Sequence, residues 1–143
     1  MGTTNAMIGY GTLLKRGDGA NPENFTTVAE VLSCTGPNLS LNIVDATHME
    51  SPGYTQEFLP GLIDPGTITL NCAFVPSDTS QSNLMSDLKN RTKRNFQMVF
   101  PDPTNTTWEF AGYVVGWAVT APINDRLTAD ISIKVTSVIS QSK

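Results

Sequence analysis

The feature that most constrains the fold is a stretch of strict alternation that follows two turn signals. In residues 57–78, EFLPGLIDPGTITLNCAFVPSD, the dipeptides Pro60-Gly61 and Pro65-Gly66 favour turns, because proline presets φ and glycine accepts positive φ. The stretch therefore begins as a predicted loop over residues 57–66. After it, apolar residues occupy every second position: Ile68, Leu70, Cys72 and Phe74. A period of two with β-branched and aromatic residues predicts a half-buried strand.

A second alternating stretch lies near the C-terminus and is the cleanest strand signal in the chain. Its inward positions are Leu127, Ala129, Ile131, Ile133 and Val135, and its outward positions are Thr128, Asp130, Ser132, Lys134 and Thr136. Further strands are predicted over residues 25–35, 39–44, 95–100 and 106–120. In the last of these the apolar parity changes near Gly112, which predicts a bulge there that redirects Tyr113, Val115 and Trp117.

Only one segment has a helical pattern. Asp78 is a good N-cap for a helix over residues 79–91, whose narrow apolar stripe comprises Leu84, Met85 and Leu88. The cations that follow, Lys89, Arg91, Lys93 and Arg94, are open to two readings, a nucleic-acid patch or a solvated helix end that complements the helix dipole. The second is favoured, because no aromatic platform accompanies them. The predicted fold is mainly β: a single domain over residues 1–143 that forms an antiparallel β-sandwich or barrel with one flanking α-helix.

Residues 45–60 form a long predicted loop between early strands. Its core, Asp45–Tyr54 (DATHMESPGY), has no periodicity, and loops of this length in compact domains are commonly functional. Met49, Pro52 and Tyr54 could pack on a partner, so we interpret this segment as a contact loop. Residues 1–5 are small and polar, which is typical of a flexible N-terminal arm.

The sequence carries no recognisable chemistry. The single histidine, His48, lies near Asp45 and Glu50, but this irregular spacing is weak support for a metal site, and Asp45 is better explained as a hydrogen-bond acceptor within its own turn. No catalytic or phosphate-binding motif occurs. We therefore predict no enzyme, no cofactor and no metal.

Charge and cysteine content narrow the classes further. A net charge of −4 argues against non-specific nucleic-acid binding. Without a secretory signal, Cys34 and Cys72 are interpreted as small buried hydrophobes in a reducing compartment. No apolar run approaches the roughly 20 residues of a membrane span.

The order of several motifs resembles one family. In sequence these are Val44-Asp45-Ala46-Thr47-His48, then residues 57–66, the strand over residues 68–74, Pro76-Ser77-Asp78 with the single helix, Phe100-Pro101-Asp102, residues 108–113 (WEFAGY), and Ala121-Pro122. Together they resemble the major tail tube proteins of long-tailed, non-contractile, lambda-like bacteriophages, over nearly the whole chain. One departure from this pattern is that the sequence ends soon after Val135-Thr136-Ser137, so we expect it to lack the additional immunoglobulin-like domain that some relatives carry.

This resemblance implies a structural virion protein. Copies would form hexameric rings that stack into the tail tube, whose sheets join into a β-barrel around the channel for DNA ejection. Implied partners are other copies of the chain and the tail tip, tape measure and tail terminator proteins, with DNA passing through unbound. The implied location is the virion tail, assembled in the cytoplasm of the host bacterium.

The resemblance also suggests two sets of functional residues. The contact loop, reaching a neighbouring ring or subunit, would use Asp45, Thr47, His48, Met49, Glu50, Pro52 and Tyr54. The channel would be lined by Thr128, Asp130, Ser132 and Thr136, a weakly charged face that would not hold phosphates. Lys134 on this face is an exception unless it pairs with an acid such as Asp130. The same face could instead be the outer solvent side.

Two other classes remain open at this stage. One is a related tube protein of a contractile tail or a type VI secretion system. The other is a carbohydrate- or host-binding β-sandwich module that uses Trp108, Tyr113 and Trp117 for stacking, although core packing explains these aromatics better.

Overall fold

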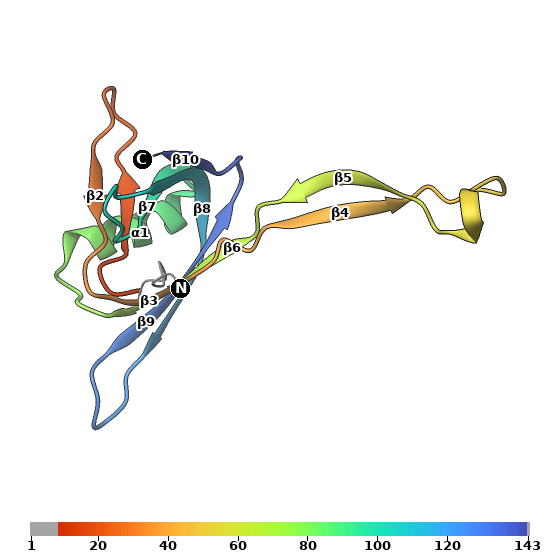
Figure 1. Cartoon of the computed structure of the whole chain (residues 1–143). Coiled ribbons are helices and arrows are strands. Elements are labelled where there is room, and N and C mark those ends of the chain that lie inside the picture. Colours follow the sequence, from red (N-terminus) through yellow and green to blue (C-terminus); the bar gives the residue numbers. More distant parts are fainter. Residues whose placement is uncertain (1–8, 143) are drawn as a thin grey trace, which may run out of the picture.

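The computed structural model describes residues 9–142 and shows a β-rich body from which a long arm projects (Figure 1). The strands are β1 (Leu13–Gly17), β2 (Phe25–Thr27), β3 (Val31–Thr35), β4 (Ser40–Asp45), β5 (Phe58–Asp64), β6 (Thr67–Ala73), β7 (Arg94–Val99), β8 (Thr107–Thr120), β9 (Thr128–Val135) and β10 (Ser140–Ser142). The helices are α1 (Thr79–Asn90) and the 3₁₀ turn η1 (Pro52–Tyr54). The predicted fold class, mainly β and antiparallel with one flanking α-helix, is confirmed.

The body is one curled antiparallel sheet with the strand order β2-β1-β7-β8-β9-β6-β3, and β10 added beside β8. Strands β2 and β3 lie at opposite ends of this order, yet only residues 28–30 join them. The sheet must therefore curl until its two ends approach each other. The prediction of one strand over residues 25–35 is wrong, because Glu30 adopts a φ of 60° and breaks the extended chain.

The core depends on the pairing of β6 with β9. Ile68 lies opposite Ile133, and Leu70 lies opposite Ile131. All four side chains are completely buried, as the alternation predicted. Leu127 precedes β9 and is exposed, so the inward series begins at Ala129.

The bulge in β8 lies at Val115 rather than at Gly112, since the register with β9 shifts between Val114 and Gly116. Phe110 and Val114 point inward before the bulge, and Trp117 packs against the core after it. Tyr113 and Val115 are exposed, which corrects the predicted parity. Gly112 has another role: a Cβ there would collide with the Lys134 carbonyl oxygen on β9. The short strand β10, which pairs with the first residues of β8, was not predicted.

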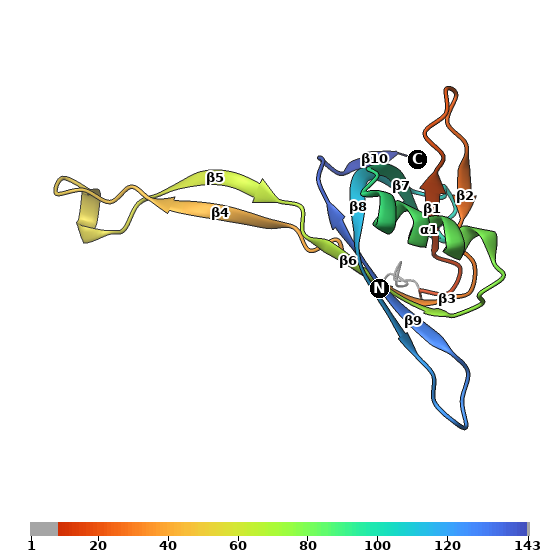
Figure 2. The ribbon, with the colours of Figure 1, turned by 180° about the vertical axis from the view of Figure 1, so that it is seen from behind.

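Helix α1 lies in front of the strands of the body in Figure 2 and begins where the sequence indicated. The Asp78 carboxylate accepts hydrogen bonds from the backbone N–H groups of Ser80 and Gln81, and Leu84 is fully buried in the core. Gln81 is buried as well. Its amide donates to the carbonyl oxygens of Ala29 (3.1 Å) and Ala73 (2.9 Å) and so fixes the helix to β6 and to the link between β2 and β3.

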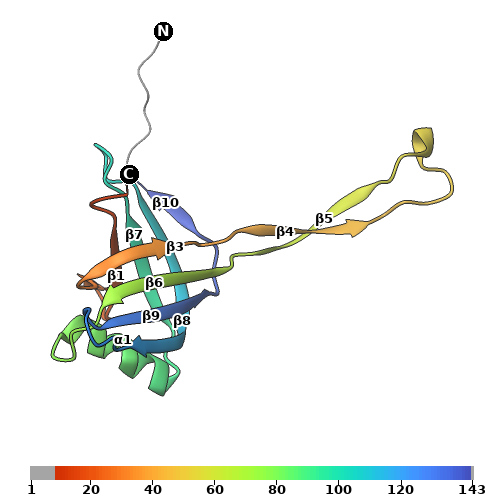
Figure 3. The same cartoon turned by 90° about the horizontal axis from the view of Figure 1, so that it is seen from below.

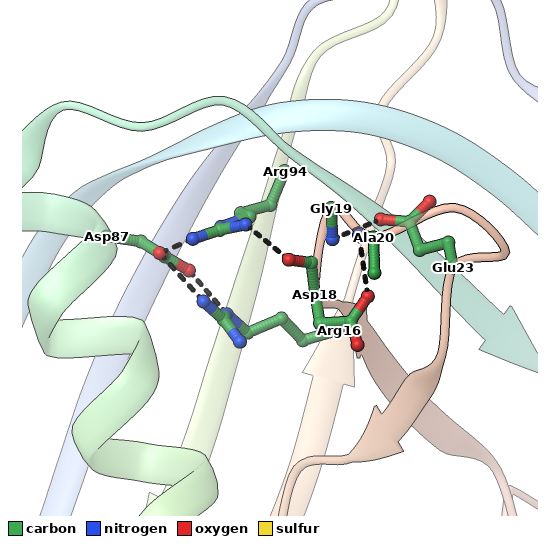
Figure 4. Close-up of polar contacts among 7 residues, drawn as sticks. All are labelled: Arg16, Asp18, Gly19, Ala20, Glu23, Asp87 and Arg94. Carbon is green, nitrogen blue, oxygen red and sulfur yellow. Dashed lines mark hydrogen bonds and ion pairs between the residues drawn. The ribbon is translucent and has the colours of Figure 1, made fainter.

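A buried ionic cluster fixes the other end of α1 (Figure 4). Asp87, whose side chain is 3% exposed, accepts from Arg16 Nη2 on β1 at 2.9 Å and from Arg94 Nε on β7 at 3.1 Å. Arg94 also donates to the Asp18 carbonyl oxygen at 2.8 Å. The Asp87 carboxylate therefore ties the helix to two strands, and Arg94 extends this network to the turn after β1.

Cys34 and Cys72 are free thiols that do not pair with each other. Burial raises the pKa of each to about 11, so both remain protonated and behave as small apolar side chains.

We expect Asp87→Ala to lower the free energy of unfolding by about 3 kcal/mol or more, because it leaves two partly buried guanidinium groups without their carboxylate. Urea unfolding followed by tryptophan fluorescence measures this change. The exposed Asp125→Ala is the control, with an expected change within about 0.5 kcal/mol. A loss of less than about 1 kcal/mol for Asp87→Ala would show that the cluster does not anchor α1.

Candidate assembly surfaces

The arm is a two-stranded antiparallel ribbon of β4 and β5 that stands clear of the body (Figures 1 and 3). Residues 57–66 were predicted to be a loop, but Phe58–Asp64 is strand β5. The Pro60-Gly61 pair lies inside it, where the register with β4 shifts between Leu41 and Ile43. Proline is tolerated there because a ribbon has open edges and a bulge. The predicted long loop of residues 45–60 is therefore shorter: it covers residues 46–57 at the end of the arm, and residues 58–60 belong to β5.

Two glycines let the arm leave the body. Gly36 has a φ of 103° and Gly66 a φ of 81°. A Cβ on Gly36 would collide with the Thr67 carbonyl oxygen, and one on Gly66 would collide with the backbone of Asn38. The two backbone segments that enter and leave the arm lie so close together at its base that a side chain at Gly36 or Gly66 would collide with the opposite segment.

The arm is apolar and unprotected. Every residue of β4 and β5 is exposed. Because paired residues share a face, one face carries an almost unbroken apolar row: Leu41, Ile43, Phe58, Pro60 and Ile63. An isolated two-stranded ribbon is marginally stable in water, and an exposed apolar row of this kind marks an interaction surface.

Hydrogen bonds hold the tip of the arm together. Asp45 accepts from the Thr47 backbone N–H at 2.9 Å, and bonds to Thr47 lower the pKa of Asp45. This is the local turn role predicted for Asp45. Ser51 Oγ donates to Glu57 at 2.7 Å and lies 3.2 Å from His48 Nδ1, while Glu57 lies 3.3 Å from the same nitrogen. In a serine-hydrolase triad the acid and the serine use opposite ring nitrogens, so this cluster holds the loop rather than relaying a proton.

The structure brings all seven predicted contact residues together at the end of the arm. The side chains of Met49 and Tyr54 are completely exposed, and Thr47, His48, Glu50 and Pro52 are also exposed. They have no packing role in the body. The predicted N-terminal arm, residues 1–5, lies outside the described residues.

A second surface is the outward face of β6 and β9. Thr128, Asp130 and Ser132 point away from the core, and Asn71 Nδ2 donates to Asp130 at 2.6 Å. Lys134 pairs with Asp64 at the base of the arm, 3.2 Å away, and not with Asp130 as suggested. Hydrogen bonding from Gly66 and the nearby Lys134 lower the pKa of Asp64. Thr136 lies beyond the end of β9, where its N–H donates to the Ala111 carbonyl oxygen at 2.9 Å. We call the outward face of β6 and β9 the polar face.

The strands that carry the polar face, β6 and β9, are flanked by β3 and β8, and each of these two outer strands has an open edge (Figure 3). Four strands lie side by side in the order β3-β6-β9-β8. β3 pairs only with β6, and β7 pairs with β8 only as far as Gly112, so residues 113–120 of β8 have a neighbour on one side only among the described residues. An open edge on each side allows copies of the chain to join head to tail.

Within residues 9–142 no cluster of three or more metal-ligating side chains occurs. Nor is any helix in the described part of the chain both long and apolar enough to cross a membrane.

An exposed apolar arm, a weakly charged face and two open sheet edges are typical of a structural protein that assembles with other copies of itself. The family model described as "Lambda phage tail tube protein, TTP" matches residues 11–142. The chain therefore belongs to the lambda phage tail tube protein family, as its motif order suggested. A comparison with curated proteins gives no match.

Solved structures share the fold at low sequence identity. The tail of an empty gene transfer agent particle, refined with C6 symmetry, has a TM-score of 0.76 at 19% identity and covers 96% of this chain and 100% of that one. A sheath/tube terminator structure of an extracellular contractile injection system has a TM-score of 0.75 at 12% identity, with coverages of 99% and 100%. The SPP1 tail tube has a TM-score of 0.70 at 10% identity, with coverages of 95% and 78%.

If the arm is an assembly surface, its apolar side chains serve association and not folding. We expect Phe58→Ser with Ile63→Thr to leave the melting temperature of the body unchanged within about 2 °C and to prevent the formation of large assemblies. Circular dichroism and sedimentation measure the two effects. The buried control Leu70→Ala should lower the free energy of unfolding by about 2–5 kcal/mol. Normal assembly by the arm variant would contradict this role.

Proposed function

We propose that this tail tube protein closes into hexameric rings that stack to form the tube through which DNA leaves the virion. The observation that carries the proposal is the pair of open edges on the four-stranded sheet β3-β6-β9-β8. Joining the β3 edge of one copy to residues 113–120 of β8 in the next is a heterologous contact, which closes into a ring when the rotation between copies is right. The six-fold count is taken from the C6 symmetry of the gene transfer agent tail.

The dimensions of such a ring suit a DNA channel. Six copies with four strands each give a wall of 24 strands. With strands about 4.8 Å apart and tilted by about 40°, the wall would be about 48 Å across between backbones. This is wider than a DNA duplex.

The polar face is the better candidate for the channel wall. Its outward residues on β6 and β9 include only two charged side chains, Asp130 and Lys134, and Asp64 neutralises the second. A wall without free cations does not retain phosphates, so DNA can slide. Thr128, Asp130 and Ser132 would line the channel, with Thr136 at the end of the wall beside the base of the arm.

The arm would connect successive rings. Its contact residues lie far from the body, and its apolar face needs a partner that the described chain does not supply. The partners at the two ends of the tube and inside it would be the tail tip, tail terminator and tape measure proteins. Assembly would take place in the host cytoplasm, and the role would be structural, without catalysis or a cofactor.

The sugar-binding alternative has little support in the geometry. Trp108 packs edge-to-face on Phe100 with ring centroids 5.2 Å apart, and Trp117 packs likewise on Phe74 at 6.3 Å. Both tryptophans are partly buried against the core, and only Tyr113 lies outside it. The contractile alternative shares the fold, but the matching family is the lambda type.

Ring closure can be tested with two variants that each block one edge. Leu32 and Val115 are the unpaired residues at the bulges of β3 and β8, so proline there should block the open edge and leave the existing ladders intact. We expect Leu32→Pro and Val115→Pro each to remain monomeric. Mixed together, they should form 1:1 dimers and no rings, because one intact edge remains on each partner.

Circular dichroism would first show that both proline variants are folded, and analytical ultracentrifugation would then give the masses. Rings formed by either variant alone would contradict closure through these edges. A mixture that remained monomeric would do the same.

The channel assignment predicts a change in DNA retention. Asp130→Lys should leave rings and tubes intact but make the tubes hold short duplex DNA at about 50 mM salt, with release at about 200 mM. Cosedimentation of DNA with tubes measures this. Glu109→Lys on β8, outside the polar face, is the charge-matched control and should retain no DNA. Equal DNA retention by the two variants would place the polar face on the outside of the tube.

A further inference from the structure

Two surfaces of opposite charge lack a partner in the described chain. The acidic tip of the arm comprises Asp45, Glu50 and Glu57, with His48 beside Glu57. The basic helix end comprises Lys89 in the last turn of α1, Arg91 at its C-cap, and Lys93 just before β7. All three basic side chains are exposed, and none forms an ion pair with another described residue.

The basic helix end differs from the cations beside it. Arg16 and Arg94 are held by Asp87 inside the fold, whereas Lys89, Arg91 and Lys93 point into solvent. Helix α1 packs through Leu84 on the buried side of the sheet, opposite the polar face. These three charges therefore lie away from the proposed channel and are free to meet another protein surface.

The register of the sheet places these surfaces along its length. The arm leaves the body at the end of the sheet where Thr67 pairs with Lys134, and the turn between β8 and β9 lies at the other end, where Ala73 pairs with Thr128. The first residue of β7, Arg94, pairs with Gly112, and Gly112 pairs with Val135. The basic helix end thus lies at the same end of the sheet as the base of the arm.

The arm is long enough to pass along the sheet of a copy in the next ring. If rings stack in the same orientation, the arm of one copy would start at the β8–β9 turn of the copy in the next ring, because the base of the arm and this turn lie at opposite ends of the sheet. Residues 55–64, between the 3₁₀ turn at the tip and the base, span up to about 33 Å, whereas the eight residues of β9 span about 26 Å, so the arm is long enough to pass along the sheet of that copy. Its tip then reaches the level of the basic helix end.

The apolar part of the arm also finds a partner along this path. Side chains around the β8–β9 turn, at the end of the sheet that the arm meets first, are apolar and exposed: Val119, Ile123 and Leu127. They are 39–98% exposed, and they serve no packing role in the body. Apolar contact at the base and opposite charges at the tip together fix the direction of the arm.

Given that the arm connects successive rings, we infer where it binds: its acidic tip pairs with the basic helix end of the copy in the next ring, and its apolar face packs on the β8–β9 turn of that copy. This inference rests on the proposed stacking of rings. It assigns the binding site of the arm and gives the cations at the C-terminal end of α1 a role in assembly.

Charge exchange tests the pairing. Glu50→Lys and Lys93→Glu should each impair tube growth, and the two substitutions in one chain should restore it, because every lysine at a tip then meets a glutamate. An exposed ion pair contributes about two-fold, and six equal contacts per ring multiply this to about 60-fold in the concentration needed for tube growth at about 0.15 M salt. Electron microscopy and sedimentation measure this concentration.

The controls separate this inference from the ring proposal. Glu109→Lys changes the net charge as Glu50→Lys does, on an exposed side chain of β8 without a hydrogen bond in the described structure, and should grow tubes normally. Single variants that grow tubes like the unaltered chain, or a double variant no better than either single one, would overturn the pairing. Binding of short DNA that Lys93→Glu abolishes without affecting tubes would assign the basic helix end to nucleic acid instead. Failure of the unaltered chain to form rings would contradict the ring proposal itself.

Discussion

The pairing of β6 with β9 is the interaction on which the rest of the structure depends. One side of this pair is apolar and fully buried, and the other side is polar. The buried residues are Ile68, Leu70, Ile131 and Ile133. The apolar side forms the core that α1 covers. The polar side needs no cover, so it is free to face a channel. Both strands also end at the base of the arm, where Lys134 and Asp64 connect the sheet to the ribbon. The positions of the core, the polar face and the arm are therefore set by one pair of strands.

The ion-pair cluster of Asp87 stabilises the body, whereas the arm of β4 and β5 is available for assembly. Asp87 holds α1 against β1 and β7 through two arginines, so the body is complete without a neighbour. Among the described residues no comparable cluster holds the strands of the arm to the body, and the apolar row of the arm is exposed to water. We therefore expect the body to fold in the isolated chain, whereas the arm depends on other copies to cover its apolar row.

The sequence predicted the features that depend on local periodicity. The alternation of β6 and β9, the cap at Asp78 and the single helix were all visible in it, because side chains two or three to four positions apart face the same way in these elements. The contact residues at the tip and the channel residues on β9 followed from the family resemblance. The structure places the first group on the arm and most of the second on the polar face, but their roles in assembly remain proposals.

The features that escaped prediction depend on distant partners. Asp87 and Gln81 look like ordinary surface residues of a helix until Arg16, Arg94 and Ala29 are brought beside them by the curled sheet. Strand β5 contains Pro60-Gly61, a dipeptide that favours turns, so the sequence predicted a loop there despite the apolar residues around it. The segment is extended because it pairs with β4. The break at Glu30 and the bulge at Val115 are likewise set by curling of the sheet, which no local pattern records.

Cryo-electron microscopy of tubes grown from the purified protein tests the central claim most directly. We expect stacked six-membered rings in which β6 and β9 turn their polar face toward a central channel and β3 of each copy pairs with β8 of its neighbour. Tubes with this face on the outside would contradict the channel assignment. Single particles that never form rings, even when seeded with tail tips, would contradict the proposed ring and tube assembly of this chain.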